Sequence, residues 1–240
     1  MPDRAAIVTG ASRGIGRAIA ETLGGEGFAL TLSARKPQTL EKTARELRDK
    51  GFEVDLLPAN VADEDEIRRL VAMHRKRFGR LDVLVNNAGV AIGAAAGEHQ
   101  TKYLDMQLDV NVRAMIIAYR ESLDLLRAAG TEHGNALVMN MASLAGKSPQ
   151  PWLSAYAATK AAVIAYTRAM NKELNAEGIK SVAFCPGFVD TDMAEFVKDV
   201  IPADEMLRTT DITEALRFLL RVSPACVVPE IVFQRPGEAI

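Results

Sequence analysis

The segment Ala5-Ala6-Ile7-Val8-Thr9-Gly10-Ala11-Ser12-Arg13-Gly14-Ile15-Gly16 decides the fold of this chain. Its first residues form an uninterrupted apolar run, which is typical of a strand buried on both faces of a parallel sheet. A glycine-rich turn follows at once, and residues 17–23 are expected to continue as an amphipathic helix. Glycines let the backbone approach a phosphate closely, and the free N–H groups of a first helical turn point toward it. The segment therefore predicts a phosphate site for a dinucleotide, although its Gly-x-x-x-Gly-x-Gly spacing differs from the general Gly-x-Gly-x-x-Gly fingerprint.

The same alternation of strand and helix continues along the whole chain. Further strands are predicted at 28–33, 53–57, 82–85, 135–141, 180–184 and 231–234. Helices are predicted at 39–50, 63–77, 103–129, 154–176 and 213–221, and the stretch before residue 208 is expected to be mobile. Because no linker interrupts this order, residues 1–240 are expected to form one α/β domain with a doubly wound parallel sheet.

Composition excludes several other classes of protein. The chain has 240 residues, 48% of them hydrophobic, and a net charge of −2 without a basic face, so neither nucleic acid nor an anionic membrane is an expected partner. No apolar run reaches the roughly 18–20 residues that span a bilayer. Cys185 and Cys226 lack metal-type spacing, and His74, His99 and His133 stand apart. We therefore expect no metal site and a cytoplasmic protein with reduced cysteines.

The end of the second predicted strand bears on the choice of cofactor. Ala34-Arg35-Lys36 stands where an NAD-preferring site places Asp or Glu to hold the ribose 2′-OH. Two cations replace that acid, and Arg13 in the glycine-rich turn is a third, so the sequence favours NADP(H) with its 2′-phosphate. Alternatively, Arg35 and Lys36 simply begin a solvated helix.

Tyr156 and Lys160 form a candidate proton-transfer pair. They stand four residues apart in an Ala-rich helical run, so both side chains lie on one face of the helix. A free phenol titrates near ~10, and an adjacent ammonium that lowers this pKa by about three units must supply roughly 4 kcal/mol. Alternatively, the pair is a core tyrosine and a solvated lysine. The glycine-rich turn favours the catalytic interpretation, as does Ser143 just past the strand 135–141, where ligands of open α/β sheets bind.

Two further features bear on the site. Asn86-Asn87-Ala88-Gly89 follows the fourth predicted strand, and its small residues leave room for a flat ligand. Asn111 lies in the middle of the predicted helix 103–129, where Asn is unfavourable, so it indicates either a local bend or a functional amide. Residues 145–153 are expected to form a wall or lid over the site.

In their order and spacing these motifs resemble those of the short-chain dehydrogenases/reductases, over nearly the whole chain. The motifs are Thr9-Gly10-x-x-x-Gly14-x-Gly16, Asn86-Asn87-Ala88-Gly89, Asn111, Ser143, Tyr156-x-x-x-Lys160 and Pro186-Gly187. The resemblance implies a Rossmann-type sheet of about seven strands with helices on both faces. It also implies NAD(P)-dependent oxidation or reduction at a carbonyl or alcohol carbon.

The resemblance further implies a role for each site residue. Tyr156 would donate the proton to the carbonyl oxygen, and Ser143 would hold and polarise that oxygen. Lys160 would bind the nicotinamide ribose and lower the phenol pKa, and Asn111 would fix a water that relays protons. Asn86 and Gly89 would form the nucleotide-side wall, and Thr191 would contact the nicotinamide amide. The residues expected against the cofactor are Gly10, Ser12, Arg13, Gly14, Ile15, Gly16, Arg35, Lys36, Asn60, Val61, Asn87, Ala88, Gly89, Tyr156, Lys160, Pro186, Gly187, Val189 and Thr191.

Three features depart from the family pattern. Asn60-Val61 replaces the usual Asp-Val, Ala142 replaces a common Ser, and the segment 229–240 lacks the usual Gly-rich ending, which in many tetrameric members forms a subunit interface. The helices 103–129 and 154–176 carry apolar residues on several sides, which predicts a homodimer or homotetramer formed through them. The residues on which this prediction depends are Leu123, Leu126, Val163, Ile164 and Met170.

The resulting functional prediction is an NADPH-dependent reductase of a ketone, aldehyde or oxoacyl substrate. One alternative is an alcohol or hydroxysteroid dehydrogenase that works in the oxidative direction, and another is a non-catalytic NADP-sensing protein. Ala91, Ile92, Trp152 and Phe188 predict an apolar substrate pocket, but the substrate itself does not follow from the sequence.

Overall fold

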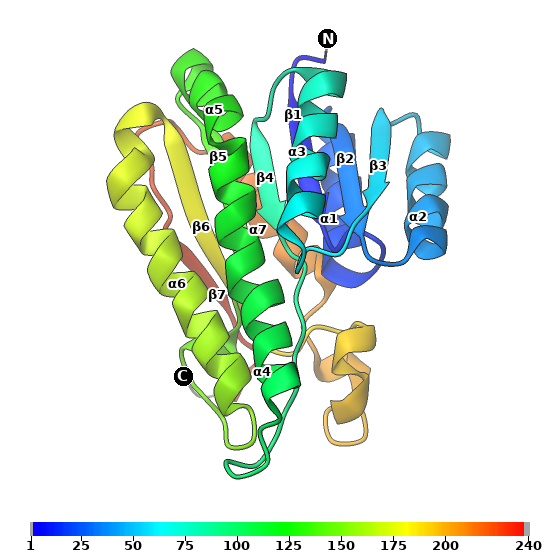
Figure 1. The fold of residues 1–240 in the computed structure, drawn as a ribbon, viewed down its shortest axis with the longest axis vertical. Coiled ribbons are helices and arrows are strands. Elements are labelled where there is room, and N and C mark those ends of the chain that lie inside the picture. The colour runs from blue at the N-terminus through cyan, green and yellow to red at the C-terminus, as the bar shows by residue number, and fades with distance from the viewer. Residues whose placement is uncertain (1, 238–240) are drawn as a thin grey trace.

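The protein is described over residues 2–237 by a computed structural model, whose centre is one seven-stranded sheet (Figure 1). All neighbouring strands pair in parallel, in the order β3-β2-β1-β4-β5-β6-β7. The strands are β1 (Ala5–Thr9), β2 (Ala29–Ala34), β3 (Val54–Pro58), β4 (Val83–Asn86), β5 (Ala136–Met141), β6 (Ile179–Pro186) and β7 (Glu230–Phe233). The predicted doubly wound parallel sheet is confirmed.

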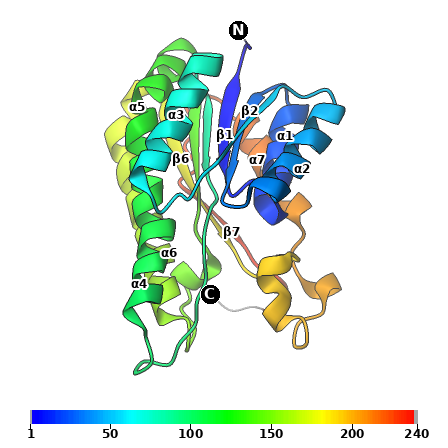
Figure 2. The same cartoon turned by 45° about the vertical axis from the view of Figure 1, so that its right-hand side comes forward.

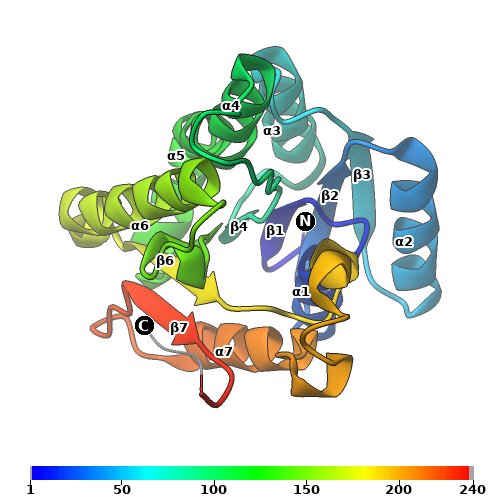
Figure 3. The same ribbon diagram turned by 90° about the horizontal axis from the view of Figure 1, so that it is seen from below.

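Helices cover both faces of this sheet (Figures 2 and 3). One face carries α1 (Gly14–Gly25), α2 (Pro37–Asp49) and α7 (Thr209–Arg221). The other carries α3 (Glu64–Phe78), α5 (Ala114–His133) and α6 (Ser154–Leu174), with α4 (Thr101–Leu108) extending beyond the sheet. Because both faces are covered, strand residues are buried on either side, as all five residues of β1 are.

Helix α3 begins and ends at residues that can be recognised from the sequence. The Asp63 side chain accepts a hydrogen bond from the backbone N–H of Asp65 and caps the N-terminus. Gly79 ends the helix with φ 70°, a left-handed conformation that favours glycine. Acidic residues occupy the first turn and basic residues the last, which suits the helix dipole.

The predicted helix 103–129 is wrong as a single element. The structure has α4, then a π-helical turn at Asp109–Arg113, and then α5, which runs to His133. Asn111 lies inside the π-helical turn and is 3% exposed. The local departure that Asn111 predicted is therefore present, because its amide forms hydrogen bonds outside the helix.

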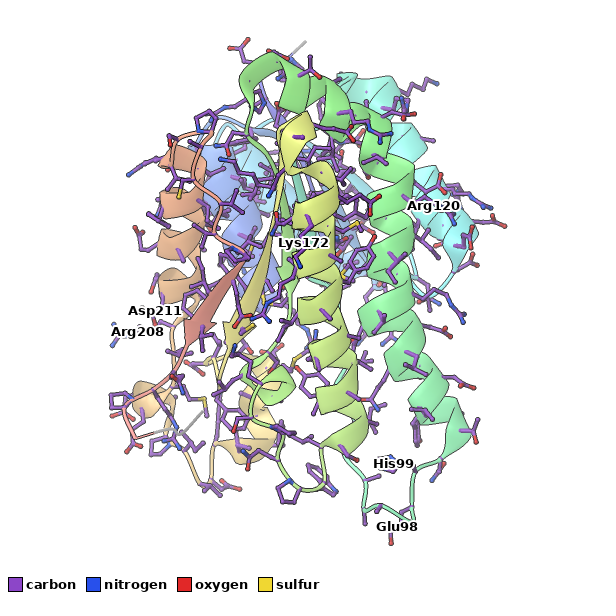
Figure 4. The ribbon with its side chains drawn as sticks, turned by 90° about the vertical axis from the view of Figure 1, so that its left-hand side faces the viewer. Glu98, His99, Arg120, Lys172, Arg208 and Asp211 are labelled. Atoms are coloured by element: carbon purple, nitrogen blue, oxygen red, sulfur yellow. The ribbon has the colours of Figure 1, made fainter. Side chains whose placement is uncertain are left out.

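The segment between β6 and α7 is more ordered in backbone than the sequence indicates. It contains two short 3₁₀ helices, Asp192–Val197 and Ala203–Glu205. Ala194, Ile201 and Met206 form a small buried cluster of their own. Arg208 and Asp211, labelled in Figure 4, mark the start of α7, where the Asp211 carboxylate accepts a hydrogen bond from the Arg208 backbone N–H.

Candidate active site

The strand order changes direction between β1 and β4, and the predicted site residues gather at the carboxyl edge of the sheet on either side of that point. The residues 10–16 follow β1, 86–89 overlap and follow β4, Ser143 follows β5 and Gly187 follows β6. In an open parallel sheet such a switch point opens a crevice for a ligand.

The glycine-rich turn is packed so closely that only glycine fits. Gly10 and Gly14 have φ of 66° and 53°. A Cβ on Gly16 would lie 2.3 Å from the Gly10 carbonyl oxygen and 2.4 Å from Asn87 Nδ2. No side chain caps the N-terminus of α1, so the N–H groups of its first turn remain available to an anion. The turn therefore fits the pyrophosphate of a dinucleotide cofactor.

Thr9 joins this turn to the end of β4. Its hydroxyl accepts hydrogen bonds from the backbone N–H groups of Asn87 and Ala88, both at 3.1 Å, and donates to the Val85 carbonyl. Asn87 Nδ2 donates to the carbonyls of Thr9 and Gly10 at 3.0 and 3.2 Å. The Asn87 side chain thus shapes the turn.

Arg35 and Lys36 are exposed at the carboxyl end of β2, between β2 and α2. Within residues 2–237 neither forms an ion pair at 4.0 Å or less, so both cations are available to an anionic ligand. Arg13 differs, because its Nη1 lies 2.8 Å from Asp192 Oδ2 on the segment after β6. Lys36 also supplies the backbone N-cap of α2.

Ser143, Tyr156 and Lys160 come together from two elements. Ser143 begins the short 3₁₀ helix Leu144–Gly146 after β5, and its Oγ lies 3.4 Å from the Pro186 carbonyl oxygen. Tyr156 and Lys160 lie on α6, and Lys160 Nζ is 5.7 Å from the centroid of the Tyr156 ring. Lys160 is 3% exposed and donates to the Met141 carbonyl at 2.7 Å. Its ammonium is thus held inside the protein, and it is not the solvated lysine of the alternative interpretation.

Burial is the main cause of the pKa shifts of Tyr156 and Lys160. It raises the pKa of Tyr156, while the hydrogen bond with the Ser143 side chain lowers it. Burial also lowers the pKa of Lys160 to about 8, against a smaller opposing effect of Cys185. Ser143 is thus one group that lowers the phenol pKa, and the lowering expected from Lys160 stays a prediction.

Asn111 ties the π-helical turn to the loop after β4 and to α6. Its Oδ1 accepts from the Val90 N–H at 2.8 Å, and its Nδ2 donates to the Val90 carbonyl at 2.8 Å and to Thr159 Oγ1 at 3.0 Å. Both donor hydrogens of the amide are thus used within the protein. Gly89 lies beside this contact, since a Cβ there would be 3.4 Å from Asn111 Oδ1 and 3.5 Å from Lys160 Nζ.

The remaining predicted cofactor residues flank the same edge of the sheet. Asn60 is exposed after β3, and its Oδ1 accepts from the Ala62 N–H at 3.3 Å, while Val61 packs near α3 and α5. Pro186 ends β6, and Val189 is buried beyond it. Thr191 approaches the glycine-rich turn, since a Cβ on Gly14 would lie 3.3 Å from Thr191 Cγ2. Ser12 and Ile15 lie within the turn itself, where the Ser12 carbonyl accepts from Thr43 Oγ1.

The predicted apolar pocket is only partly formed by the residues named for it. Ile92 and Trp152 line a cavity of about 640 Å³ together with Tyr103 and Leu104, whereas Ala91 and Phe188 do not line it. Phe188 instead packs edge-to-face against Phe196 in the segment after β6.

Sequence reasoning missed two groups that support the site. Thr159, between Tyr156 and Lys160, accepts from Asn111 and donates to the Tyr156 carbonyl at 2.7 Å. Asn86 donates to Asn140 at 2.8 Å, and Asn140 donates to Thr167 at 3.0 Å, so a buried polar chain runs from β4 to α6. A single Asn in each of two otherwise apolar strands, Asn86 in β4 and Asn140 in β5, is the sequence signal for such a chain.

Comparison with known proteins agrees with this arrangement. The family model of the short chain dehydrogenases matches residues 4–200. The chain belongs to the short chain dehydrogenases. A Streptomyces coelicolor protein named "Putative ketoacyl reductase" is 40% identical over 195 residues, which cover 81% of this chain and 74% of that protein. As a member of this family, the protein is an oxidoreductase that acts on CH–OH or C=O groups with a nicotinamide dinucleotide.

Two solved structures show the same fold. An actinorhodin polyketide ketoreductase variant with NADPH is 31% identical, with a TM-score of 0.86 over 96% of this chain and 94% of that one. A 3-ketoacyl-(acyl-carrier-protein) reductase from Brucella melitensis with NADH is 26% identical, with a TM-score of 0.87 over 97% of this chain and 96% of that one. Similar short chain dehydrogenases thus occur with either cofactor.

Other features of this short chain dehydrogenase bear on its partners. Leu126, Val163 and Ile164, from which association was predicted, are buried within the subunit, and Leu123 and Met170 pack against its core. No helix among the described residues has the length and apolar character needed to cross a bilayer. Over residues 2–237, no three His, Cys, Asp or Glu side chains gather in a way that could hold a metal ion.

Proposed function

We propose that this enzyme reduces a carbonyl group (of a ketone, an aldehyde or a 3-oxoacyl compound) to an alcohol with NADPH, and that Tyr156 is the general acid. The observation that carries the proposal is the convergence of Ser143, Tyr156 and the buried Lys160 beside Gly89, on the loop that packs against the glycine-rich turn. The similarity to proteins named ketoacyl reductase and polyketide ketoreductase supports a carbonyl substrate.

The nicotinamide cofactor supplies the hydride when it is bound. Negative charge then develops on the substrate oxygen, where Ser143 Oγ–H donates a hydrogen bond and Tyr156 Oη–H donates its proton. Burial raises the pKa of Tyr156 and so favours the protonated phenol further. Lys160 would hold the nicotinamide ribose, and its ammonium would stabilise the phenolate that remains after proton transfer. Asn111 would keep the π-helical turn and the Val90 loop in place. A water bound to its side chain would donate a hydrogen bond to Oδ1, since both hydrogens of Nδ2 are used within the protein.

We propose NADPH as the preferred cofactor because Arg35 and Lys36 are exposed and without ion pairs at the carboxyl end of β2. A 2′-phosphate bound between them would be neutralised, whereas the 2′-OH of NADH gains nothing from either cation. Arg35→Ser should therefore weaken NADPH binding roughly tenfold, which is about 1.4 kcal/mol, and leave NADH binding unchanged. Equal loss for both cofactors would contradict this assignment.

The test of the reaction is NADPH consumption against a panel of ketones, aldehydes, quinones and oxoacyl thioesters. Tyr156→Phe should lower kcat by roughly 10²- to 10⁴-fold on any substrate that is found, without loss of NADPH binding. Tyr166→Phe is the matched control, because Tyr166 lies on the same helix, α6, outside the residues assigned to the site, and it should keep its activity. Turnover that survives in Tyr156→Phe would overturn the proposed acid. Tight NADPH binding without turnover across the panel would favour the sensing alternative.

We also propose that residues 1–240 fold as a single domain and that two subunits associate through α4, α5 and α6. Apolar side chains remain exposed along α4 and the start of α5, and α6 exposes Ala158, Ala161 and Ala165 at helical spacing. The exposed apolar residues are Tyr103, Leu104, Met106, Leu108 and Ile116. Size measurement by light scattering tests this association, and Leu104→Glu with Leu108→Glu should yield monomers. Both cysteines are free thiols, which fits the cytoplasm.

A further inference from the structure

The segment 229–240 departs from the family pattern, and its described part places a carboxylate beside the turn that carries Ser143. Glu230, the first residue of β7, has a side chain that is 9% exposed. Its Oε1 pairs with Lys147 Nζ, and its Oε2 lies 2.8 Å from Arg168 Nη2. Lys147 directly follows the 3₁₀ helix Leu144–Gly146, and Arg168 lies on α6 (Figure 4 shows α6 toward the viewer, with β6 and β7 beside it). One carboxylate thus joins the Ser143 turn to the helix of Tyr156.

The same turn also rests directly on the backbone of α6. A Cβ on Gly146 would lie 2.7 Å from the Lys160 carbonyl carbon and 2.9 Å from the Ala161 nitrogen. The turn can neither approach α6 more closely nor rotate against it without a clash. Contact with α6 therefore limits movement in one direction, and the Glu230–Lys147 ion pair limits movement away from it.

The position of Glu230 is itself fixed by strand pairing. Glu230 pairs with Ala183 of β6, whose N–H donates to the Pro229 carbonyl at 3.0 Å. At the other end of β7, the Phe233 carbonyl accepts from the Gly187 N–H at 2.9 Å. Ser143 Oγ lies against the Pro186 carbonyl, next to Gly187. Strand β7 therefore contacts the Ser143 turn through Glu230 and, through Phe233, the backbone on which the Ser143 hydroxyl rests.

We propose that Glu230 is a positioning residue, which pairs with Lys147 and Arg168 to hold the Ser143 turn so that Ser143 and Tyr156 meet at one substrate oxygen. This inference rests on the proposed function for the role of these two hydroxyls. The divergent C-terminal strand would thus affect catalysis by fixing the position of the Ser143 turn, since Glu230 itself contacts neither hydroxyl. Small displacements of reacting groups lower rates strongly, and about 1 Å can reduce a rate roughly 100-fold.

The experiment compares Glu230→Gln, Lys147→Met and Lys147→Arg with the wild type. Glu230→Gln and Lys147→Met should each lower kcat roughly tenfold, with KM and NADPH affinity changed less than about twofold. The double variant should be no slower than Glu230→Gln, because Glu230→Gln already removes the ion pair with Lys147. Lys147→Arg keeps the pair and should retain most of the activity. Arg217→Met is the matched control, because it removes a comparably exposed pair with Glu26 between α7 and α1, and it should keep its kcat.

A second measurement separates this inference from the proposed function. The phenol of Tyr156 can be titrated by its ultraviolet absorbance as the difference between each protein and its Tyr156→Phe counterpart. Since the Ser143 side chain lowers the pKa of Tyr156, displacement of the turn in Glu230→Gln should raise that pKa, and Arg217→Met should leave it unchanged. This readout applies even if no carbonyl compound is reduced, an outcome that would count against the proposed function alone. An unchanged Tyr156 pKa in Glu230→Gln, or an equal loss of kcat in Arg217→Met, would overturn the positioning role.

Discussion

The glycine-rich turn and the segment 188–208 meet beside the candidate site, and they are held in different ways. The turn is so closely packed that a Cβ on Gly16 would lie 2.3 Å from the Gly10 carbonyl oxygen. Hydrogen bonds of Thr9 and Asn87 hold it in this conformation. The segment has a small cluster of its own and leaves Met193, Phe196 and Val200 at 50, 58 and 81% exposed. The cofactor side is therefore shaped before any ligand binds, whereas the facing segment has apolar surface left to cover.

The largest effect should follow from filling the space that the rigid turn lacks. In Gly16→Ala, the new methyl would overlap the Gly10 carbonyl oxygen and Asn87 Nδ2, both of which belong to the same packed unit. We expect the free energy of unfolding to fall by more than about 3 kcal/mol and NADPH binding to weaken more than roughly tenfold. Denaturant unfolding and fluorescence titration measure both quantities.

Gly25→Ala provides the matched control, because nothing lies within 4 Å of a Cβ at Gly25, at the end of the same helix. It should be neutral or slightly stabilising. If Gly16→Ala were as stable and bound NADPH as well as Gly25→Ala, the turn would be adaptable and the contrast with the segment 188–208 would be lost.

The next effect concerns His74, a fully buried histidine on α3 beneath the rigid side. Arg80 contributes a carbonyl oxygen, which only accepts, so Nε2 carries the proton and Nδ1 accepts from the Thr31 hydroxyl, both at 2.8 Å. Burial lowers the pKa of His74 to about 4. Between pH 6.5 and 4 the unfolded chain binds a proton that the folded protein does not. The free energy of unfolding should therefore fall by about 3 kcal/mol as the pH drops through this window.

Unfolding of the wild type and of His74→Gln across this pH range measures the contribution of His74. If the variant is too unstable to study, NMR titration of the His74 ring in the wild type gives the same answer. A His74 that titrates near 6.5 would show that water reaches the space between α3 and β2. The rigid packing around the glycine-rich turn would then not extend as far as His74.

Lys160 on α6 is a second buried base, and its titration should change stability in the same direction as that of His74, with a smaller net effect of its substitution. Its folded pKa of about 8 lies below the ordinary 10.5, so the unfolded chain binds more protons between these values and stability rises with pH there. At pH 7 the buried ammonium destabilises the fold. Lys160→Met should therefore raise the free energy of unfolding by about 1–2 kcal/mol at pH 7, after allowing for the lost bond to Met141, while turnover is lost. A variant less stable than the wild type at pH 7 would show that the ammonium is not disfavoured by its site.

The contrast between the two regions also explains which parts were predictable from the sequence. The fold followed from alternating apolar strands and amphipathic helices, and the residues 10–16, Ser143, Tyr156 and Lys160 were placed at one edge because parallel strands end together. The positions of these residues depend on neighbours in the sequence or on the order of the strands in the sheet.

Long-range side-chain contacts were not predictable in this way. Val90 and Thr159 as partners of Asn111, and Glu230 as the partner of Lys147, depend on how separate helices and strands pack in space. The hydrogen bond by which Ser143 lowers the pKa of Tyr156 joins a turn to a helix, and the i, i+4 spacing within one helix does not describe it. The burial of Leu126 and Val163 likewise could not be read from an apolar helix face, since such a face packs equally well inside a subunit or between subunits.

The smallest effect concerns the ion pair that links the two regions, Arg13 to Asp192. Both side chains are 70% exposed, so the pair contributes little to stability, about 0–1 kcal/mol, and is weakened by salt. The proposed 2′-phosphate of NADPH would compete with Asp192 for the Arg13 guanidinium, whereas NADH would not. Asp192→Asn should therefore tighten NADPH binding up to about threefold at low ionic strength, leave NADH binding unchanged and leave the free energy of unfolding within about 0.5 kcal/mol. Calorimetric titration at two salt concentrations measures this difference, with Glu195→Gln as a control on the same 3₁₀ helix whose side chain pairs with Lys198 instead. If Asp192→Asn weakened NADPH binding, the carboxylate would be helping to close the segment over the cofactor, and the two regions would act as one unit.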